Sequence, residues 1–257
     1  MRVIVTRPRR EAQDWVQTLQ QAGHEALALP LIGIAPAPDT AALQRAWRQL
    51  DGYLGLMFVS ANAVDGFFAA RPADVPLPAQ TWATGPGTVG ALRRAGVPAQ
   101  HITAPPADAA QFDSEALWAL VAGRIVPGAR VLIVRGADAS AGASTEGAGR
   151  DWFARQVAAA GGSVDFVASY QRQRPVLDAA QLALARAAAQ DGSVWLFSSS
   201  EAVLNLQASL PQQDWGAARA VATHARIAQA ARAAGFALVR ESRPALADVR
   251  ASIESMQ

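Results

Sequence analysis

Short runs of apolar residues alternate along this chain with longer stretches in which apolar residues recur at helical spacing. The short runs are rich in β-branched residues and are bounded by glycine and proline, which predicts buried strands. In the first half of the chain we expect strands near residues 3–7, 25–32, 53–59, 80–84 and 100–103. Helices are predicted near residues 10–22, 40–49, 61–69, 86–95 and 114–122.

The second half follows the same order, with strands predicted near residues 130–134, 163–169, 193–198, 219–223 and 237–240. Glycine can adopt the left-handed conformation that ends many helices, and such stops are predicted at Gly23, Gly96, Gly161 and Gly235. Because strands and helices alternate throughout, the pattern predicts an α/β fold with parallel sheets and helices on both faces.

The two halves also resemble each other in sequence. Residues 58–64 (FVSANAV) recur 139 positions later as residues 197–203 (FSSSEAV), and residues 83–84 (AT) recur at the same distance as 222–223. A looser pair, residues 3–7 (VIVTR) and 131–135 (VLIVR), is 128 positions apart. The change in distance predicts an insertion in the second copy, within the run of small residues at 138–149. The chain is therefore expected to contain an internal repeat.

The composition limits the possible chemistry. The 257 residues are 51% hydrophobic, which is enough for a substantial core in one or two domains. No apolar run approaches the length of about 20 residues that a membrane helix needs, and we expect a cytoplasmic protein without membrane contact. The sequence has no cysteine, which excludes disulfides and thiolate chemistry. Its three histidines have no metal-ligand spacing, so no metal site is expected.

The high isoelectric point, about 9.9, does not indicate nucleic-acid binding. The formal net charge is only +2, and all 23 basic side chains are arginine, which stays protonated to very high pH. No basic stripe with interleaved aromatic residues is present, so no nucleic-acid partner is expected. Arginine suits bidentate binding of carboxylates, although a GC-rich coding bias would also produce this composition.

One glycine-rich segment matches a nucleotide-binding pattern. Residues 85–90 (GPGTVG) form a literal G-x-G-x-x-G between a predicted strand and a predicted helix. The segment follows the fourth strand rather than the first, and Pro86 removes one backbone donor. A helix N-terminus that binds an anion such as a carboxylate is favoured over a dinucleotide site, and a tight strand-to-helix turn is the structural alternative.

Several polar residues stand where predicted strands end. Ser60 and the run Ser198–Ser200 end strands and begin helices, so they are helix caps, ligand-binding residues or both. Arg7 and Arg135 hold equivalent strand ends in the two copies, either as ligand-binding cations or in surface ion pairs. Tyr170 closes a predicted strand. It is interpreted either as a functional residue or as an amphipathic residue at the rim of the core.

Together these segments resemble the uroporphyrinogen-III synthase family. The resemblance rests on an ordered set that spans nearly the whole chain: residues 3–8 with 29–32, 58–64, 85–88, 134–136 with 150–152, Tyr170, 197–203 and 222–223. No single motif is specific. The segment 224–227 (HARI) departs from the family, which often has Gly-Pro-x-Thr there, and the run at 138–149 is longer than usual.

The resemblance implies two flavodoxin-like domains related by the internal repeat. One domain would combine residues 1–34 with 175–257, and the other would contain residues 38–169. Residues 35–37 and 170–174 would form a flexible two-segment linker, and the active site would lie in the cleft between the domains.

The resemblance also implies a reaction and a site. The substrate would be hydroxymethylbilane, which would lose water and close to uroporphyrinogen III with inversion of ring D. No cofactor would be needed, and the protein would be a monomer with, at most, transient contact with the preceding pathway enzyme. Tyr170 would be catalytic, and the substrate-binding residues would be Arg7, Ser60, Asn62, Gly85, Thr88, Arg135, Gly136, Ser198, Ser199, Ser200 and Arg226. The alternative function is a two-domain protein that binds a small anionic ligand without chemistry, such as a diverged, inactive relative.

Overall fold

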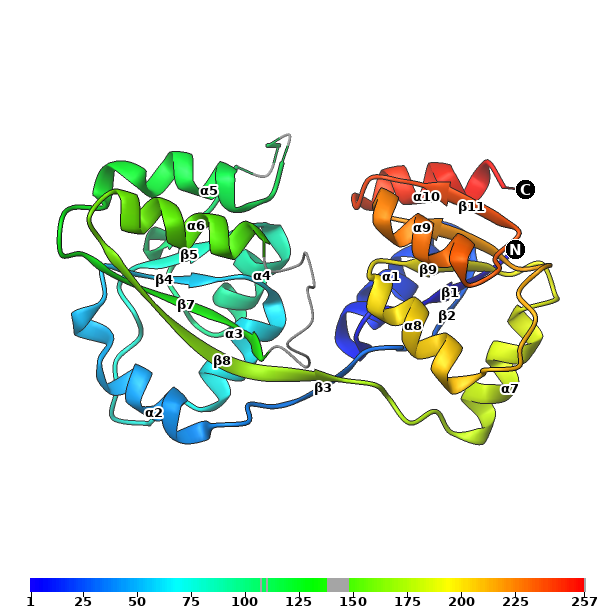
Figure 1. Ribbon diagram of the computed structural model, residues 1–257, viewed down its shortest axis with the longest axis horizontal. Helices are drawn as coiled ribbons and strands as arrows, with labels where there is room; N and C mark the ends of the chain where they lie inside the picture. Colours follow the sequence, from blue (N-terminus) through cyan, green and yellow to red (C-terminus); the bar gives the residue numbers. More distant parts are fainter. Residues whose placement is uncertain (107, 110, 138–147, 257) are drawn as a thin grey trace. The chain divides into compact units, whose positions relative to one another are not determined.

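The computed structural model describes residues 1–106, 108–109, 111–137 and 148–256 (Figure 1). The chain divides into two compact units. The first unit combines Met1–Gly33 with Gln173–Gln257, and the second contains Ile34–Arg172. Most of the small-residue insertion predicted at 138–149 lies outside the described residues.

The first unit is built on a five-stranded sheet in which all paired strands are parallel. The strand order is β2-β1-β9-β10-β11, so strands from the two ends of the chain lie side by side. The strands are β1 (Arg2–Val5), β2 (Glu25–Ala28), β9 (Val194–Phe197), β10 (Arg219–Ala222) and β11 (Leu238–Glu241).

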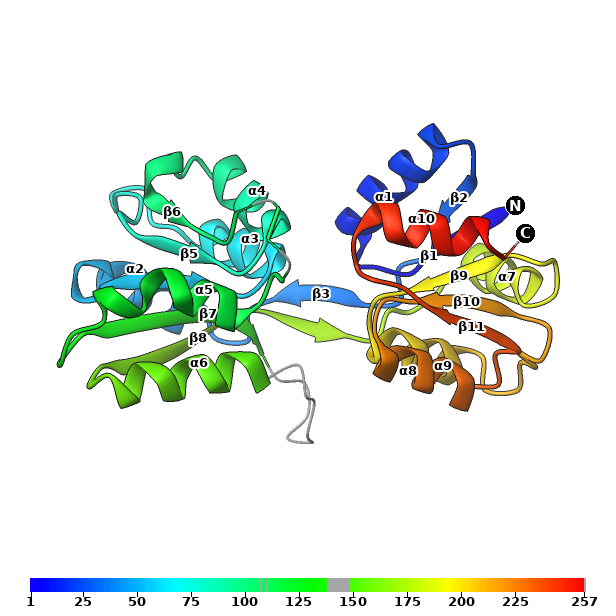
Figure 2. The same cartoon turned by 90° about the horizontal axis from the view of Figure 1, so that it is seen from above.

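Both faces of this sheet are covered by helices (Figure 2). Alternation along β1 explains this, because Val3 and Val5 point to one face and Ile4 to the other, and all three are fully buried. Helices α1 (Arg9–Gln21) and α10 (Leu246–Glu254) cover the face of Val3. Helices α7 (Ala179–Ala188), α8 (Ser200–Ser209) and α9 (Ala225–Ala233) cover the face of Ile4.

The second unit contains a six-stranded sheet with the order β3-β8-β7-β4-β5-β6. Its strands are β3 (Gly33–Pro36), β4 (Gly55–Phe58), β5 (Thr81–Ala83), β6 (Ile102–Thr103), β7 (Arg130–Ala137) and β8 (Ser163–Gln173). Helices α2 (Thr40–Arg48), α3 (Ala61–Ala69) and α4 (Pro86–Arg94) cover one face. Helices α5 (Ser114–Val121) and α6 (Ala148–Ala159) cover the other. Short 3-10 turns lie at Leu50–Gly52, Ala99–His101 and Ala122–Arg124.

The two sheets have corresponding strand orders. In the first, β2-β1-β9-β10-β11 is the order 2-1-3-4-5 along the chain, which is that of flavodoxin-like folds. In the second sheet, β8-β7-β4-β5-β6 is also the order 2-1-3-4-5 if β7 and β8 are numbered 1 and 2, and β4, β5 and β6 are numbered 3, 4 and 5. Strand β3 is an additional edge strand. This correspondence pairs β1 with β7, β9 with β4 and β10 with β5, which are the strands that carry the sequence repeat.

The predicted α/β class with parallel sheets is confirmed, with differences at the edges of elements. Gly23, Gly96, Gly161 and Gly235 all have positive φ, between 82° and 97°, as the helix stops require. The strand predicted at 25–32 was too long, because β2 ends at Ala28 and Pro30 has no N–H to donate.

The predicted linker residues 35–37 and 170–174 lie largely in strands. The edge strand β3 runs to Pro36, and β8 continues to Gln173 as the neighbour of β3. Sequence patterning missed this because Gln171, Arg172 and Gln173 continue the strand with polar side chains. Within the described part of the chain, no helix is both long enough and apolar enough to span a bilayer.

A close contact between α3 and β8 fixes one end of the second sheet. A side chain at Gly66 would overlap the carbonyl group of Ser169, so only glycine allows this approach. The hydroxyl of the buried Ser169 donates to the carbonyl oxygen of Ala63 at 2.9 Å, which ties the strand to the same helix.

We expect Gly66→Ala to destabilise the protein by about 1–3 kcal/mol, because the added methyl group meets backbone that cannot move independently. Gly87→Ala is the matched control, since Gly87 is also helical and nothing lies within 4 Å of the position of its added Cβ. The control should be neutral or more stable by about 0.5–1 kcal/mol. Urea unfolding monitored by tryptophan fluorescence measures both variants. Equal effects of the two substitutions would contradict this account of the α3–β8 contact.

Candidate functional site

The candidate residues collect at the carboxyl edge of each sheet. In the first unit Arg7 follows β1, Ser198, Ser199 and Ser200 follow β9, and Arg226 lies in the first turn of α9 after β10. In the second unit the candidates lie at the ends of β7, β8, β4 and β5: Arg135, Gly136, Tyr170, Ser60, Asn62, Gly85 and Thr88. Because parallel strands all end at the same edge, each unit brings its own set together.

In both sheets these residues flank the point where the strand order reverses. The reversal falls between β1 and β9 in the first unit and between β7 and β4 in the second. In open α/β sheets this is where the loops diverge and ligands bind. The junction in the first unit is tied by Thr6, whose buried hydroxyl donates to the carbonyl oxygen of Leu196 at 2.7 Å.

Tyr170 lies at this edge of the second unit, beside Ser60. Its side chain is only 4% exposed, so the ring is part of the core rather than a free rim residue. Its hydroxyl is 3.3 Å from the Oγ of Ser60. Ser60 caps α3, with its Oγ accepting a hydrogen bond from the N–H of Ala63 at 3.1 Å. Asn62 is the second residue of the same helix.

Gly136 makes the position of the Tyr170 ring possible. The two residues are register partners in β7 and β8, just after an irregularity between Arg135 and Gly136. A Cβ at Gly136 would lie 2.8 Å from Cζ and 3.1 Å from the hydroxyl oxygen of Tyr170. The role of Gly136 is therefore to admit the ring, which the sequence did not indicate.

Arg7 is held by an ion pair and by an aromatic ring. Its Nη1 is 3.3 Å from Oε2 of Glu11, and its guanidinium carbon lies 4.4 Å from the ring centre of Trp15. Burial lowers the pKa of Arg7 from its ordinary value, and Glu11 opposes this shift. The sequence interpretation missed Glu11 and Trp15, although their spacing of four and eight residues from Arg7 places them on one side of a helix.

Arg135, at the equivalent strand end in the second unit, is also stacked on an aromatic ring. Its guanidinium carbon lies 5.1 Å from the ring centre of Phe166, which is 44% exposed on β8. The planar guanidinium keeps its donors in one plane when it stacks, so both arginines are oriented before any ligand arrives.

Three further candidates in the first unit have buried polar atoms. The hydroxyl oxygens of Ser198 and Ser200 and the Nε of Arg226 are shielded from solvent and have no hydrogen-bond partner within the described residues, and the same holds for the Nε of Arg7. Ser199 differs, since its hydroxyl accepts from the N–H of Glu201 and caps α8. Because polar atoms that are buried without partners are costly, each of these atoms is expected to find a partner beyond the described residues, such as water or a ligand.

The glycine-rich segment forms a strand-to-helix turn. Gly85 precedes α4 with extended backbone, and a Cβ there would lie 3.3 Å from the Cβ of Phe112. Thr88 is 5% exposed, as is Ile227 in the equivalent turn of the first unit. Both side chains therefore pack mainly into the core, and little of the Thr88 surface reaches solvent.

Metal binding has no support among the described residues, because no group of three or more histidine, aspartate and glutamate side chains is arranged to hold an ion. His224 instead caps α9, with its Nδ1 accepting from the N–H of Arg226 at 3.1 Å. His24 is buried near Glu254, with 3.9 Å between Nε2 and Oε1.

The fold and these groups define a class: an open α/β protein in which parallel sheets present arginine and hydroxyl donors at their carboxyl edges. Comparisons with known proteins specify the class further. The family model described as uroporphyrinogen-III synthase HemD matches residues 13–248. This chain belongs to the uroporphyrinogen-III synthase family. It is therefore an enzyme of porphyrin and haem biosynthesis whose substrate is a tetrapyrrole.

Two solved structures show the same fold. A mutant uroporphyrinogen III synthase from the extremely thermophilic bacterium Thermus thermophilus matches with a TM-score of 0.53 and 17% identity, over 100% of this chain and 98% of that one. Uroporphyrinogen-III synthetase from Helicobacter pylori matches with a TM-score of 0.58 and 15% identity, over the whole of both chains.

We expect Gly136→Ala to destabilise the protein by about 1–3 kcal/mol, because the new methyl group must displace the Tyr170 ring. Tyr170→Leu removes the ring atoms that the methyl group would meet, so the added cost of Gly136→Ala should fall in that background. A thermodynamic cycle from urea unfolding of the two single variants and the double variant measures the coupling. Additive effects would show that the close approach to Tyr170 is not what requires glycine.

Proposed function

We propose that this chain catalyses the closure of hydroxymethylbilane to uroporphyrinogen III, as a hydro-lyase that removes water and inverts ring D. The observation that carries the proposal is the hydrogen-bonded pair of Tyr170 and Ser60 at the carboxyl edge of the second sheet. A phenol in contact with a second hydroxyl is a suitable acid for a departing hydroxyl group. Family membership supplies the substrate class.

The substrate carries eight carboxylates, and we propose that the arginines and helix starts at the carboxyl edge of each unit are groups that can bind carboxylates. The guanidinium groups of Arg7 and Arg135 lie over the rings of Trp15 and Phe166, and a guanidinium group can form bidentate hydrogen bonds with a carboxylate. Ser198, Ser200 and Arg226 add donors that lack partners within the described residues. The first turns of α3, α4, α8 and α9 add backbone N–H groups.

The substrate can lose hydroxide and cyclise unaided to the uninverted isomer. The enzyme therefore has two tasks, to accelerate the loss of the hydroxyl and to hold the chain in the geometry that inverts ring D. Positioning and preorganised donors suffice for both. We propose that the enzyme needs neither a metal nor an organic cofactor, and that it acts as a monomer in the cytoplasm, with transient contact with the preceding pathway enzyme.

Of the two predictions that test the proposed function, the first concerns activity itself. The purified protein, treated with a chelator and given hydroxymethylbilane, should produce mainly the type III isomer, because the proposed groups all belong to the chain. Oxidation of the products and separation of the isomers measure the ratio of type III to type I. A ratio equal to that of the enzyme-free control would overturn the proposed function and favour a non-catalytic binding protein. Activity only with an added metal would overturn the metal-free mechanism.

The second prediction concerns the phenol. Tyr170→Phe should lower kcat by about 10- to 1000-fold, on the scale of a positioned general acid, while the buried ring keeps the fold intact. Tyr53→Phe is the matched control, since Tyr53 is the only other tyrosine and bonds Asp165 in the same unit. Steady-state kinetics and thermal melting compare the two. A Tyr170→Phe enzyme with wild-type kcat would remove the phenol from the mechanism.

A further inference from the structure

The hydroxyl of Ser60 stands between a backbone donor and the phenol. Its Oγ accepts from the N–H of Ala63 at 3.1 Å and is 3.3 Å from the hydroxyl oxygen of Tyr170. A serine hydroxyl has one hydrogen and two lone pairs. If Tyr170 donates to Ser60, both lone pairs are occupied and the serine hydrogen remains free for a ligand.

Burial leaves the hydroxyl of Ser60, rather than that of Tyr170, able to reach a ligand. Tyr170 is 4% exposed, its ring lies across Gly136, and its neighbour Ser169 is tied to Ala63 by a 2.9 Å hydrogen bond. The ring therefore has little freedom to turn toward a ligand. Ser60 is only half-buried and begins α3, at the edge where a ligand would bind.

We propose that Ser60 is a further catalytic residue, which donates its proton to the departing hydroxyl of the substrate and is reprotonated by Tyr170. The inference rests on the proposed function and adds a second group to its acid step. A buried phenol can then act on a substrate that it does not touch, because the serine carries the proton across the intervening distance.

The step balances within the substrate and the two residues. The bond between the hydroxymethyl carbon and its oxygen breaks, and the electron pair leaves with the oxygen. That oxygen takes the proton of Ser60 and departs as water, while Ser60 takes the proton of Tyr170. Tyr170 becomes a phenolate, and the Ser60 hydroxyl can now donate to it, which stabilises the charge. Ring closure releases a proton from the attacked pyrrole, and this proton restores Tyr170.

The internal repeat gives a comparison within the chain. Ser199 occupies the position equivalent to Ser60, 139 residues later, and also caps a helix. Both tyrosines of the chain, Tyr53 and Tyr170, belong to the second unit, so the unit of Ser199 contains no phenol. Helix capping alone therefore explains the serine at position 199. Ser60 also caps a helix, but it differs from Ser199 in having a phenol beside it.

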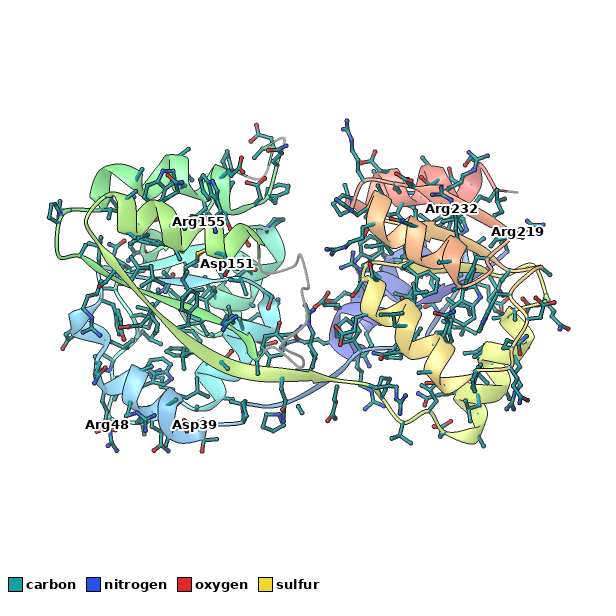
Figure 3. All side chains as sticks on the ribbon, in the orientation of Figure 1. Asp39, Arg48, Asp151, Arg155, Arg219 and Arg232 are labelled. Atoms are coloured by element: carbon teal, nitrogen blue, oxygen red, sulfur yellow. The ribbon has the colours of Figure 1, made fainter. Side chains whose placement is uncertain are left out.

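The test separates capping from proton transfer. Ser60→Gly removes the hydroxyl but keeps an acceptable cap, because glycine is tolerated at the residue before a helix. Ser60→Thr keeps both the hydroxyl and the cap. Asp39→Gly is the control for lost capping, since Asp39 caps α2 in the same unit and is labelled in Figure 3. Thermal melting checks that each variant is folded, and kcat is measured for type III formation from hydroxymethylbilane.

We expect Ser60→Gly to lower kcat by the same factor as Tyr170→Phe, within about threefold, because each substitution breaks the same chain of donors. The kcat of the double variant should be no lower than that of either single variant. The losses of activity are not additive when two groups act as a unit. Ser60→Thr should recover most of the activity, and Asp39→Gly should keep wild-type kcat.

Two results would overturn the inference while leaving the proposed function in place. Wild-type kcat in Ser60→Gly, with an impaired Tyr170→Phe, would mean that the phenol acts without the serine. A fold-loss of kcat in the double variant equal to the product of the two single losses would mean that the two hydroxyls act independently. A wild-type protein that forms no excess of type III isomer would instead reject the proposed function, and the serine step with it.

Discussion

Parallel pairing between strands that are distant in sequence is the constraint on which both units depend. In the first unit β1 lies against β9, with Val3 opposite Val194, and in the second β4 lies against β7, with Gly55 opposite Val131. Because the two strands of a parallel pair end at the same edge of the sheet, the loops that follow them begin side by side. Arg7 and Ser198 therefore follow two strands that are neighbours in the sheet, and Ser60 follows a strand that is the neighbour of the one containing Gly136.

The two arginines and the tyrosine are fixed by different means. The guanidinium groups of Arg7 and Arg135 lie over the aromatic rings of Trp15 and Phe166, which limits how far each group can move. Tyr170 is fixed by the absence of side chains, because Gly66 lets α3 approach β8 and Gly136 admits the ring. A rigid core contact therefore positions the proposed acid, while an aromatic ring packs against each of the two arginines.

Periodicity and end signals predicted most of the elements, because they reflect local physics. The glycine stops are an example, since a positive φ at Gly23 or Gly235 depends only on the helix end. The length of β8 was not predictable in this way, because its last residues are polar and are strand only through their neighbour β3. Tyr170 was predicted to close its strand, but β8 continues to Gln173, and the burial of Tyr170 could not be predicted.

In the candidate site, too, features set by the local sequence could be predicted, and contacts between distant residues could not. Strand ends in the sequence identified Arg7, Ser60 and Arg135, since loops that follow parallel strands converge whatever the tertiary detail. Their partners were harder to find. The pairing of Ser60 with Tyr170 joins residues 110 positions apart and depends on a register irregularity in β7. Glu11 and Trp15 were the exception, because simple helical spacing from Arg7 would have revealed them.

The interrupted first unit has a consequence for synthesis on the ribosome. Its strands β1 and β2 emerge first, but β9 follows β1 by almost 190 residues, and a two-stranded sheet is marginal alone. The second unit, by contrast, is complete once Arg172 has emerged. The nascent chain must therefore carry the apolar segment around Val3, Ile4 and Val5 without its partner strand β9 while the inserted unit folds. Chaperones that bind short apolar segments would therefore bind β1 at this stage, and a chain that stops before β9 would expose the same segment to proteases.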